Sequence, residues 1–159
     1  MPKITPFLWF DNQAEEAAKL YVSVFPNSKI LSIARYPGDS PGGTEGRVMT
    51  VEFELDGHKV IALNAGEMFK LSEAFSFVID CDGQDEVDHY WNALTADGGQ
   101  EAPCGWLKDR FGLSWQVTPR QLIQATTSSD REAAGRAFQA MMGMKKIDVA
   151  AIQAAYEGR

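Results

Sequence analysis

The fold of this chain is decided by the stretch Met49-Thr50-Val51-Glu52-Phe53-Glu54-Leu55. Apolar and polar side chains alternate along it without a break, which is typical of a β-strand with one buried and one exposed face. The turn-forming pair Asp56-Gly57 follows, and an apolar run from Val60 to Asn64 comes after it. This pattern predicts a β-hairpin, because a two-residue turn of this type joins strands that pair with each other.

The residues before the hairpin predict a strand, a helix and a second strand. Ile4 to Phe10 is apolar and rich in aromatic residues, and Ile30 to Arg35 is a further strand candidate. Between them, Asn12 and Glu15 have the spacing of a helix N-cap, and the apolar helical stripe that follows ends at Pro26.

The same order of elements then occurs a second time. The predicted elements are a strand at Phe75–Asp80, a helix from Val87 to Leu94, and strands at Gln100–Cys104, Trp106–Lys108 and Leu113–Thr118. We therefore predict an α+β fold class in which two βαβββ units form a curled, cup-shaped mixed sheet, with C-terminal helices. The expected single domain, 1–159, divides into residues 1–66 for the first unit, 74–119 for the second and 120–159 for the C-terminal helical extension.

Composition narrows the classes of partner. The chain has 159 residues, with 22 acidic and 15 basic side chains and a net charge of −7. It contains no cluster of Lys or Arg, so nucleic acid is not expected as a partner, because affinity for phosphate backbones comes from such clusters. The N-terminal apolar run is too short for a signal peptide or a membrane span, which predicts a cytoplasmic protein without a membrane partner. In that compartment we expect Cys81 and Cys104 to be free thiols.

One long segment carries a family resemblance, together with the duplicated order of elements and the opening residues Ile4 to Asp11. It is Cys104-Gly105-Trp106-Leu107-Lys108-Asp109-Arg110-Phe111-Gly112-Leu113-Ser114-Trp115-Gln116-Val117. The chain resembles the PhnB-like branch of the vicinal oxygen chelate (glyoxalase/bleomycin resistance/dioxygenase) superfamily, which includes proteins labelled 3-demethylubiquinone-9 3-methyltransferase. The resemblance covers nearly the whole chain, and it implies a homodimer.

The resemblance also implies where a metal ion would bind. Metal enzymes of the superfamily hold one divalent ion with four ligands from the inner faces of the first and last strands of each unit. The matching positions here are Thr5 or Pro6, Ala62 with Asn64 beside it, Phe75 or Ser76, and Gln116. None of these is His, Asp or Glu, and amide carbonyls alone hold a transition metal poorly. We therefore expect no metal and no cofactor.

Two other signals for cofactor chemistry are weak. His58 and His89 have no convergent partners in the sequence, and we expect both at the surface. The glycines between Gly38 and Gly46 lie in a Pro-rich loop with no helix pattern after it. A nucleotide-type cofactor needs a glycine-rich turn between a strand and a helix. This loop could cover the cup or be a plain surface loop.

The cup implied by the resemblance combines an aromatic wall with polar groups, which suits a small, partly apolar ligand. Its candidate ligand-binding residues are Thr5, Phe7, Trp9, Asn64, Trp106, Ser114 and Gln116. Phe7 and Trp9 could equally be packed core. However, Ser114, Gln116 and Thr118 share one strand face, and three polar side chains in that arrangement need water or a ligand.

These observations favour a metal-independent small-molecule-binding protein with a small-molecule ligand as its partner. One alternative is an enzyme in the same cup, a lyase, an isomerase or the methyltransferase of the family label, with Asn64, Glu67, Cys104 or Gln116 taking part. Another is a module that only dimerises. Cys104 has cations near it in sequence, which would favour a thiolate, but no base partner can be assigned to it. Lys108, Asp109 and Arg110 predict a solvated turn in which Asp109 caps the hairpin.

Overall fold

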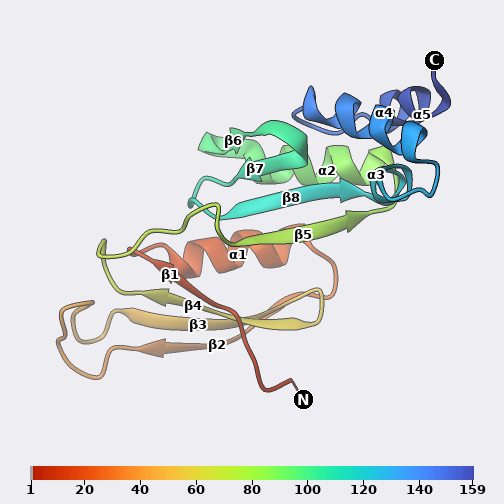
Figure 1. The fold of residues 1–159 in the computed structure, drawn as a ribbon. Coiled ribbons are helices and arrows are strands. Elements are labelled where there is room, and N and C mark those ends of the chain that lie inside the picture. The colour runs from red at the N-terminus through yellow and green to blue at the C-terminus, as the bar shows by residue number, and fades with distance from the viewer. Residues whose placement is uncertain (1) are drawn as a thin grey trace. The chain divides into compact units, whose positions relative to one another are not determined.

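Two units follow one another along the chain, and they divide between Leu71 and Ser72. The structure is a computed structural model that describes residues 2–159. Each unit contains a four-stranded sheet with a long helix against it, as Figure 1 shows. Within the described residues, no helix is long and apolar enough to cross a membrane.

The first unit has the order strand, helix, strand, strand, strand. Its elements are β1 (Phe7–Phe10), α1 (Ala14–Val24), β2 (Lys29–Arg35), β3 (Val48–Leu55) and β4 (His58–Asn64). In space the strands lie in the order β1-β4-β3-β2, with β1 parallel to β4 and the other pairs antiparallel. The predicted hairpin is confirmed, because Leu55 pairs with His58 and the two residues between them, Asp56 and Gly57, both have positive φ.

One face of this first sheet is covered by α1, and the opposite face is called here the open face of the first unit. The helix packs through small alanines and Tyr21, all of them buried, which lets it lie close to the sheet. The sheet residues that face the helix are the buried members of each alternating strand: Leu8, Phe10, Val51, Phe53, Leu55, Val60, Ala62 and Asn64. Burial of each large apolar side chain contributes roughly 1.5–3 kcal/mol to folding.

The start of α1 is held by a residue distant in sequence. The predicted N-cap at Asn12 is wrong: the N-cap position is Gln13, and no side chain at that position caps the helix. Instead, Asn64 Oδ1 accepts a hydrogen bond of 2.8 Å from the Ala14 backbone N–H, and Asn64 Nδ2 donates to Val48 O at 3.3 Å. Asn64 therefore lies on the helix side of the sheet, not on the open face where we expected it. The strand alternation that buries Val60 and Ala62 turns Asn64 the same way.

The second unit repeats the order of the first. Its elements are β5 (Ser76–Cys81), α2 (Gln84–Thr95), the short 3₁₀ turn η1 (Ala96–Gly98), β6 (Gln100–Glu101), the 3₁₀ turn η2 (Pro103–Gly105), β7 (Trp106–Lys108) and β8 (Ser114–Pro119). The strands lie in the order β5-β8-β7-β6, with β5 parallel to β8. The two mixed sheets and the repeated order confirm the predicted α+β fold class. The open face of the second unit is the sheet face opposite α2.

The second strand of the second unit, β6, is shorter than expected. β6 ends at Glu101 rather than at Cys104. Pro103 has no N–H to give to a neighbouring strand, and both Cys104 and Gly105 have positive φ, so the chain turns out of the sheet at this point.

Three helices follow β8 and form the C-terminal helical extension. They are α3 (Arg120–Thr126), α4 (Arg131–Met142) and α5 (Val149–Glu157), grouped at the C-terminal end of β8 (Figure 1). Their shared core consists of Leu122, Ala125, Ala137, Ile147 and Ile152, with Met141 and Met144 half-buried against it. These two methionines therefore fill space in the core of the extension, as flexible apolar side chains commonly do.

The extension is joined to η2 by backbone hydrogen bonds. The Cys104 N–H donates to Met144 O and the Gly105 N–H donates to Lys145 O, each at 2.8 Å. Gly105 has a φ of +83°, and a Cβ at this position would lie 3.1 Å from both Ile147 Cγ1 and Val117 O. Only glycine satisfies both the left-handed backbone and the close approach of the two neighbouring segments.

We expect Asn64→Ala to destabilise the protein by about 1–3 kcal/mol, because it leaves the buried Ala14 N–H without a partner. Urea unfolding followed by circular dichroism measures this change. Asn92→Ala, at an exposed position of α2, is the control and should change stability by no more than about 0.5 kcal/mol. Equal stability of the Asn64→Ala and wild-type proteins would show that α1 does not depend on this bond.

Two glycines in the second unit separate backbone strain from crowding. Gly112 has a φ of +93° with no atom within 4 Å of a Cβ built there, so Gly112→Ala should destabilise by about 1–2 kcal/mol through backbone strain alone. Gly105→Ala adds the contacts with Ile147 and Val117 and should lose about 1–3 kcal/mol more. The measurement is the difference in unfolding free energy between the two variants. If Gly105→Ala is no less stable than Gly112→Ala, the close packing of η2 on the extension does not contribute to the free energy of unfolding.

Candidate functional site

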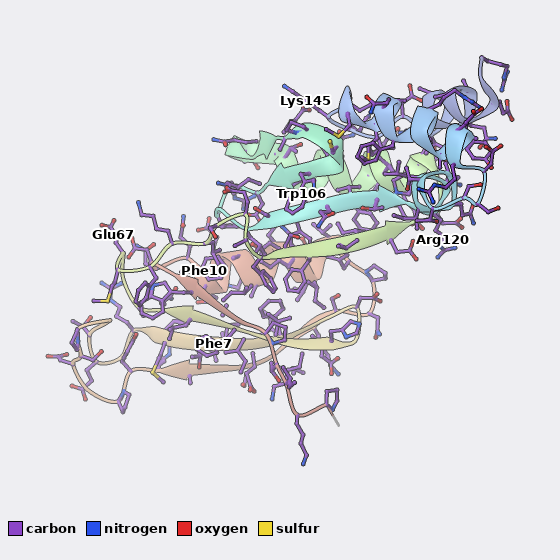
Figure 2. All side chains as sticks on the ribbon, viewed as in Figure 1. Phe7, Phe10, Glu67, Trp106, Arg120 and Lys145 are labelled. Atoms are coloured by element: carbon purple, nitrogen blue, oxygen red, sulfur yellow. The ribbon has the colours of Figure 1, made fainter. Side chains whose placement is uncertain are left out.

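The open face of the first unit carries an aromatic group. Phe7 and Trp9 stand on β1 beside Ile61 and Leu63 of β4. The Trp9 indole N–H donates to Gly66 O at 2.9 Å, and its ring meets that of Phe69 edge-on, with 5.0 Å between the ring centroids. Phe7, labelled on β1 in Figure 2, is 54% exposed. The first unit thus brings Phe7 and Trp9 to one surface, with Trp9 anchored and Phe7 accessible.

Charged groups occupy the other half of the same open face. Glu52 Oε1 lies 3.0 Å from Lys59 Nζ, and Glu52 Oε2 accepts a hydrogen bond of 3.1 Å from the Ser32 hydroxyl. The hydrogen bond from Lys59 lowers the pKa of Glu52, so the carboxylate stays ionised. The charge or hydroxyl of each of these three residues is satisfied by the others.

Two of the predicted site residues in the first half of the chain do not join the aromatic group. Thr5 lies before β1, because strand pairing begins at Phe7, and it is half-buried. Asn64 faces α1 and uses its amide group there. Glu67, a participant in the alternative enzyme hypothesis, stands in the exposed segment after β4 (Figure 2).

The open face of the second unit brings the other predicted residues together. Trp106 pairs with Gln116, and Lys108 pairs with Ser114, between β7 and β8. Gln116 Nε2 donates to the Ser76 hydroxyl of β5 at 3.0 Å. Figure 2 labels Trp106 on β7, next to β8. Trp106, Ser114 and Gln116 are therefore neighbours on one sheet, and the amide of Gln116 already has a partner within it.

A pocket of about 270 Å³ opens at this sheet around Trp106, Lys108 and Ser114. Its lining consists of Glu73, Gln100, Glu101, Ala102, Trp106, Leu107, Lys108 and Ser114. Ser114 is 1% exposed, and its hydroxyl has no hydrogen-bond partner among residues 2–159. A buried polar group without a partner costs about 1–3 kcal/mol, so a native structure that keeps one at a pocket wall requires an explanation.

The ion pair at the rim of the pocket joins Lys108 Nζ to Glu73 Oε1. Glu73 belongs to the segment before β5, and its carboxylate is mostly exposed. The hydrogen bond from Lys108 lowers the pKa of Glu73, which keeps this carboxylate ionised. Sequence analysis missed both residues. Lys108 could have been found, because it stands two positions after Trp106 on the same strand face, whereas Glu73 lies in a segment without a periodic pattern.

The turn between β7 and β8 is built on Asp109, which is 3% exposed. Its Oδ1 accepts from the N–H groups of Phe111 at 2.9 Å and Leu113 at 3.1 Å, and its Oδ2 accepts from the Trp115 indole N–H at 2.9 Å. The prediction that Asp109 caps the hairpin is confirmed, but the prediction of a solvated turn is wrong for this residue. Arg110 extends over the Phe111 ring, 4.7 Å from its centroid.

Both cysteines are free thiols. Burial raises the pKa of Cys81 to about 12, so this thiol stays protonated and unreactive. Cys104 is half-buried in η2, and its Sγ lies 3.7 Å from Met142 Sδ. No histidine is placed to activate it: His58 and His89 are exposed, and His89 contacts the ring of Tyr90.

The residues at the expected metal-ligand positions do not fit a divalent ion. Ala62 has no donor atom, Asn64 uses its oxygen to hold Ala14, and Gln116 offers only a neutral amide oxygen, which alone holds a transition metal poorly. Nowhere in residues 2–159 do three or more His, Cys, Asp or Glu side chains come together in a group that could hold a metal. The strand-to-helix turns of the two units do not have the glycine-rich sequence that binds a nucleotide-type methyl donor. The turn from β1 to α1 is Asp11-Asn12-Gln13, and the turn from β5 to α2 is Asp82-Gly83.

Comparisons with known proteins agree with the fold. The PhnB protein from Bacillus cereus is 35% identical, with a TM-score of 0.66 over 74% of this chain and 99% of that chain. PA1353 from Pseudomonas aeruginosa is 20% identical, with a TM-score of 0.61 over 75% of this chain and 98% of that one. The fosfomycin resistance protein FosX from Listeria monocytogenes is 12% identical, with a TM-score of 0.51 over 75% and 93%. The last two likenesses concern the fold alone.

Among curated proteins, none matches the chain. The model of the family described as 3-demethylubiquinone-9 3-methyltransferase matches residues 2–118, which include both βαβββ units and end before the C-terminal helical extension. This chain therefore belongs to the PhnB-like 3-demethylubiquinone-9 3-methyltransferase family and has the fold of the vicinal oxygen chelate superfamily.

Proposed function

We propose that this protein binds a small molecule, without a metal ion, in the pocket on the open face of the second unit. The observation that carries the proposal is the pocket lining, which sets the half-buried ring of Trp106 beside the polar side chains of Gln100 and Lys108. A ligand can bury apolar surface against the ring and hydrogen-bond to these polar groups.

The shape of the pocket supports a small ligand. Its volume of about 270 Å³ lies just below the range of small-molecule sites, which begins near 300 Å³. Trp106 and Leu107 provide apolar surface, and Gln100 and Lys108 provide hydrogen-bonding groups. Apolar walls with a few placed polar groups are the usual composition of a binding pocket.

Binding without a metal ion follows from the donor set. The side chains at the expected ligand positions are apolar or neutral. We also place binding before catalysis. Asn64 uses both ends of its amide within the first unit, Gln116 donates to Ser76, and Cys104 has no base beside it, so the structure gives the enzyme alternative no specific support.

We also propose that the protein is a homodimer through the open face of the first unit. Phe7, Met68 and Phe69 are each more than half exposed, and Phe69 contacts Trp9 on that face. Exposed apolar side chains grouped in this way mark an interaction surface. We propose that it binds the same surface of a second copy of the chain, because a two-fold symmetric dimer uses one patch on both subunits.

A fragment screen tests ligand binding. Small aromatic and aliphatic molecules are added to ¹⁵N-labelled protein, and the indole N–H signal of Trp106 is followed by NMR. We expect some of these fragments to shift the signal and Gln100→Ala to weaken the binding of those that hydrogen-bond to it about 5–10-fold, equal to about 1–1.4 kcal/mol. Thr118→Ala, on the same strand but outside the pocket lining, is the control and should leave affinity unchanged.

Three results would contradict the proposal. A panel that leaves the Trp106 signal unmoved rules out the pocket, and affinities that Gln100→Ala leaves unaltered for every fragment remove the polar part of the lining from the proposal. One equivalent of divalent metal retained after purification, measured by elemental analysis, excludes metal-free binding. Conversion of a bound fragment into product would assign the protein to the enzymes.

Light scattering after size exclusion tests the dimer. The wild-type protein should have twice the mass of the chain, and a Phe7→Lys/Phe69→Lys double variant should be largely monomeric at micromolar concentration, because two buried charges oppose association. Phe138→Lys, an equally apolar and exposed position on α4, should remain dimeric. A wild-type monomer, or a double variant as dimeric as the control, excludes this interface.

A further inference from the structure

The C-terminal helical extension brings a thioether to the thiol of Cys104. Cys104 Sγ lies 3.7 Å from Met142 Sδ, and the two sulfurs come from different elements, the turn η2 and the last turn of α4. Neither residue lines the pocket at Trp106. The two side chains therefore form a pair of sulfur donors outside the site already described.

Met142 differs from the methionines on either side of it in the chain. Met141 and Met144 are half-buried against the core of the extension, and Met142 is not packed there. Its side chain is 53% exposed. Packing in that core therefore does not account for the position of the Met142 sulfur beside the thiol.

Backbone hydrogen bonds hold the two sulfur-bearing segments together. The Cys104 N–H donates to Met144 O, and the Gly105 N–H donates to the carbonyl oxygen of Lys145, which Figure 2 labels, each at 2.8 Å. Because η2 and the end of α4 are already joined in this way, both sulfurs can bind one ion without a rearrangement of the chain. A site that is formed in advance avoids much of the entropic cost of binding.

We propose that Cys104 and Met142 form a binding site for a soft monovalent metal ion of the Cu(I) class. Thiolate and thioether sulfur are the ligands that select Cu(I). Zinc sites instead use thiolate, imidazole and carboxylate ligands, and neither imidazole nor carboxylate is needed here.

The distance between the sulfurs fits one bridging ion. With metal–sulfur bonds of about 2.3 Å, two sulfurs 3.7 Å apart subtend an angle of about 107° at the ion. This angle is close to those of trigonal and tetrahedral coordination. Because Met142 is more than half exposed, a further coordination position is open to solvent or to a small thiol.

The charges at the site allow a monovalent ion. The Cys104 thiol gives up its proton to solvent when the metal binds, so the thiolate and the cation together carry no net charge. Lys146, which follows α4, has its own partner, with Nζ 2.8 Å from Asp88 Oδ1. The second cysteine does not compete for the ion, because Cys81 is buried and burial raises the pKa of its thiol to about 12.

Titration with Ag(I), which is soft, monovalent and stable in air, tests whether both sulfurs bind. The protein is labelled with ¹³C in its methionine methyl groups and followed by NMR. We expect the Met142 methyl signal to shift until one equivalent has bound, while the signal of Met68, also exposed, stays in place. Zn²⁺ should leave the Met142 signal unmoved, because a thioether is a poor ligand for it.

Affinity for Cu(I) is measured without oxygen, by competition with the chelator bicinchoninate. Met142→Leu, which keeps the apolar bulk and removes the sulfur, should weaken binding at least tenfold, and Cys104→Ser should abolish it. Met68→Leu and Cys81→Ala are the matched controls and should bind as tightly as the wild-type protein. Circular dichroism checks that each variant is folded, and if Cys104→Ser is not, the wild-type titration and Met142→Leu decide the result.

Three outcomes would overturn this inference. A Met142 methyl signal that stays in place while Ag(I) binds, or equal Cu(I) affinity of Met142→Leu and the wild-type protein, means that a single thiol holds the ion. A shift of the same signal by Zn²⁺ means that the site is not selective for soft ions. All of these outcomes leave the proposed function unchanged, since none of the substituted residues lines the pocket.

Discussion

The second unit depends on the carboxylate of Asp109. This buried group accepts hydrogen bonds from two backbone N–H groups of the turn and from the indole of Trp115, and it thereby fixes how β7 returns into β8. The register that follows places Lys108 opposite Ser114 and Trp106 opposite Gln116. A shift of one residue would exchange the two faces of β8 and turn Trp115 and Val117 outward. The pocket therefore exists because a single acidic side chain, itself outside the lining, holds the hairpin in one register.

The sequence predicted the architecture well, because the signals for it are local. Alternation along Val48–Leu55 and the Asp56-Gly57 turn define a hairpin within a few residues, and the second unit shows the same periodicity. The start of α1 was predicted wrongly for the opposite reason. Asn12 has the right local spacing, but the cap comes from Asn64, and only the parallel pairing of β1 with β4 brings that residue to the helix.

The positions of some candidate site residues could be predicted because strand alternation is a local signal. Trp106, Ser114 and Gln116 alternate on neighbouring strands, so a correct strand assignment places them on one face. Alternation also placed Phe7 and Trp9 correctly on the open face of the first unit. It does not reveal which polar groups remain unsatisfied. That property depends on hydrogen bonds such as those of Gln116 with Ser76 and of Lys108 with Glu73, and these join segments that no sequence pattern relates.

The bonds between η2 and the C-terminal helical extension have a consequence for the family as a whole. The family model ends at Thr118. The C-terminal helical extension, which holds the turn between Ala102 and Trp106 through backbone hydrogen bonds, therefore lies outside the part of the chain that the model matches. None of its residues lines the pocket. Members that share both sheets can therefore differ in how rigidly this corner is supported, through changes in an appended segment, while every residue that lines the pocket stays the same.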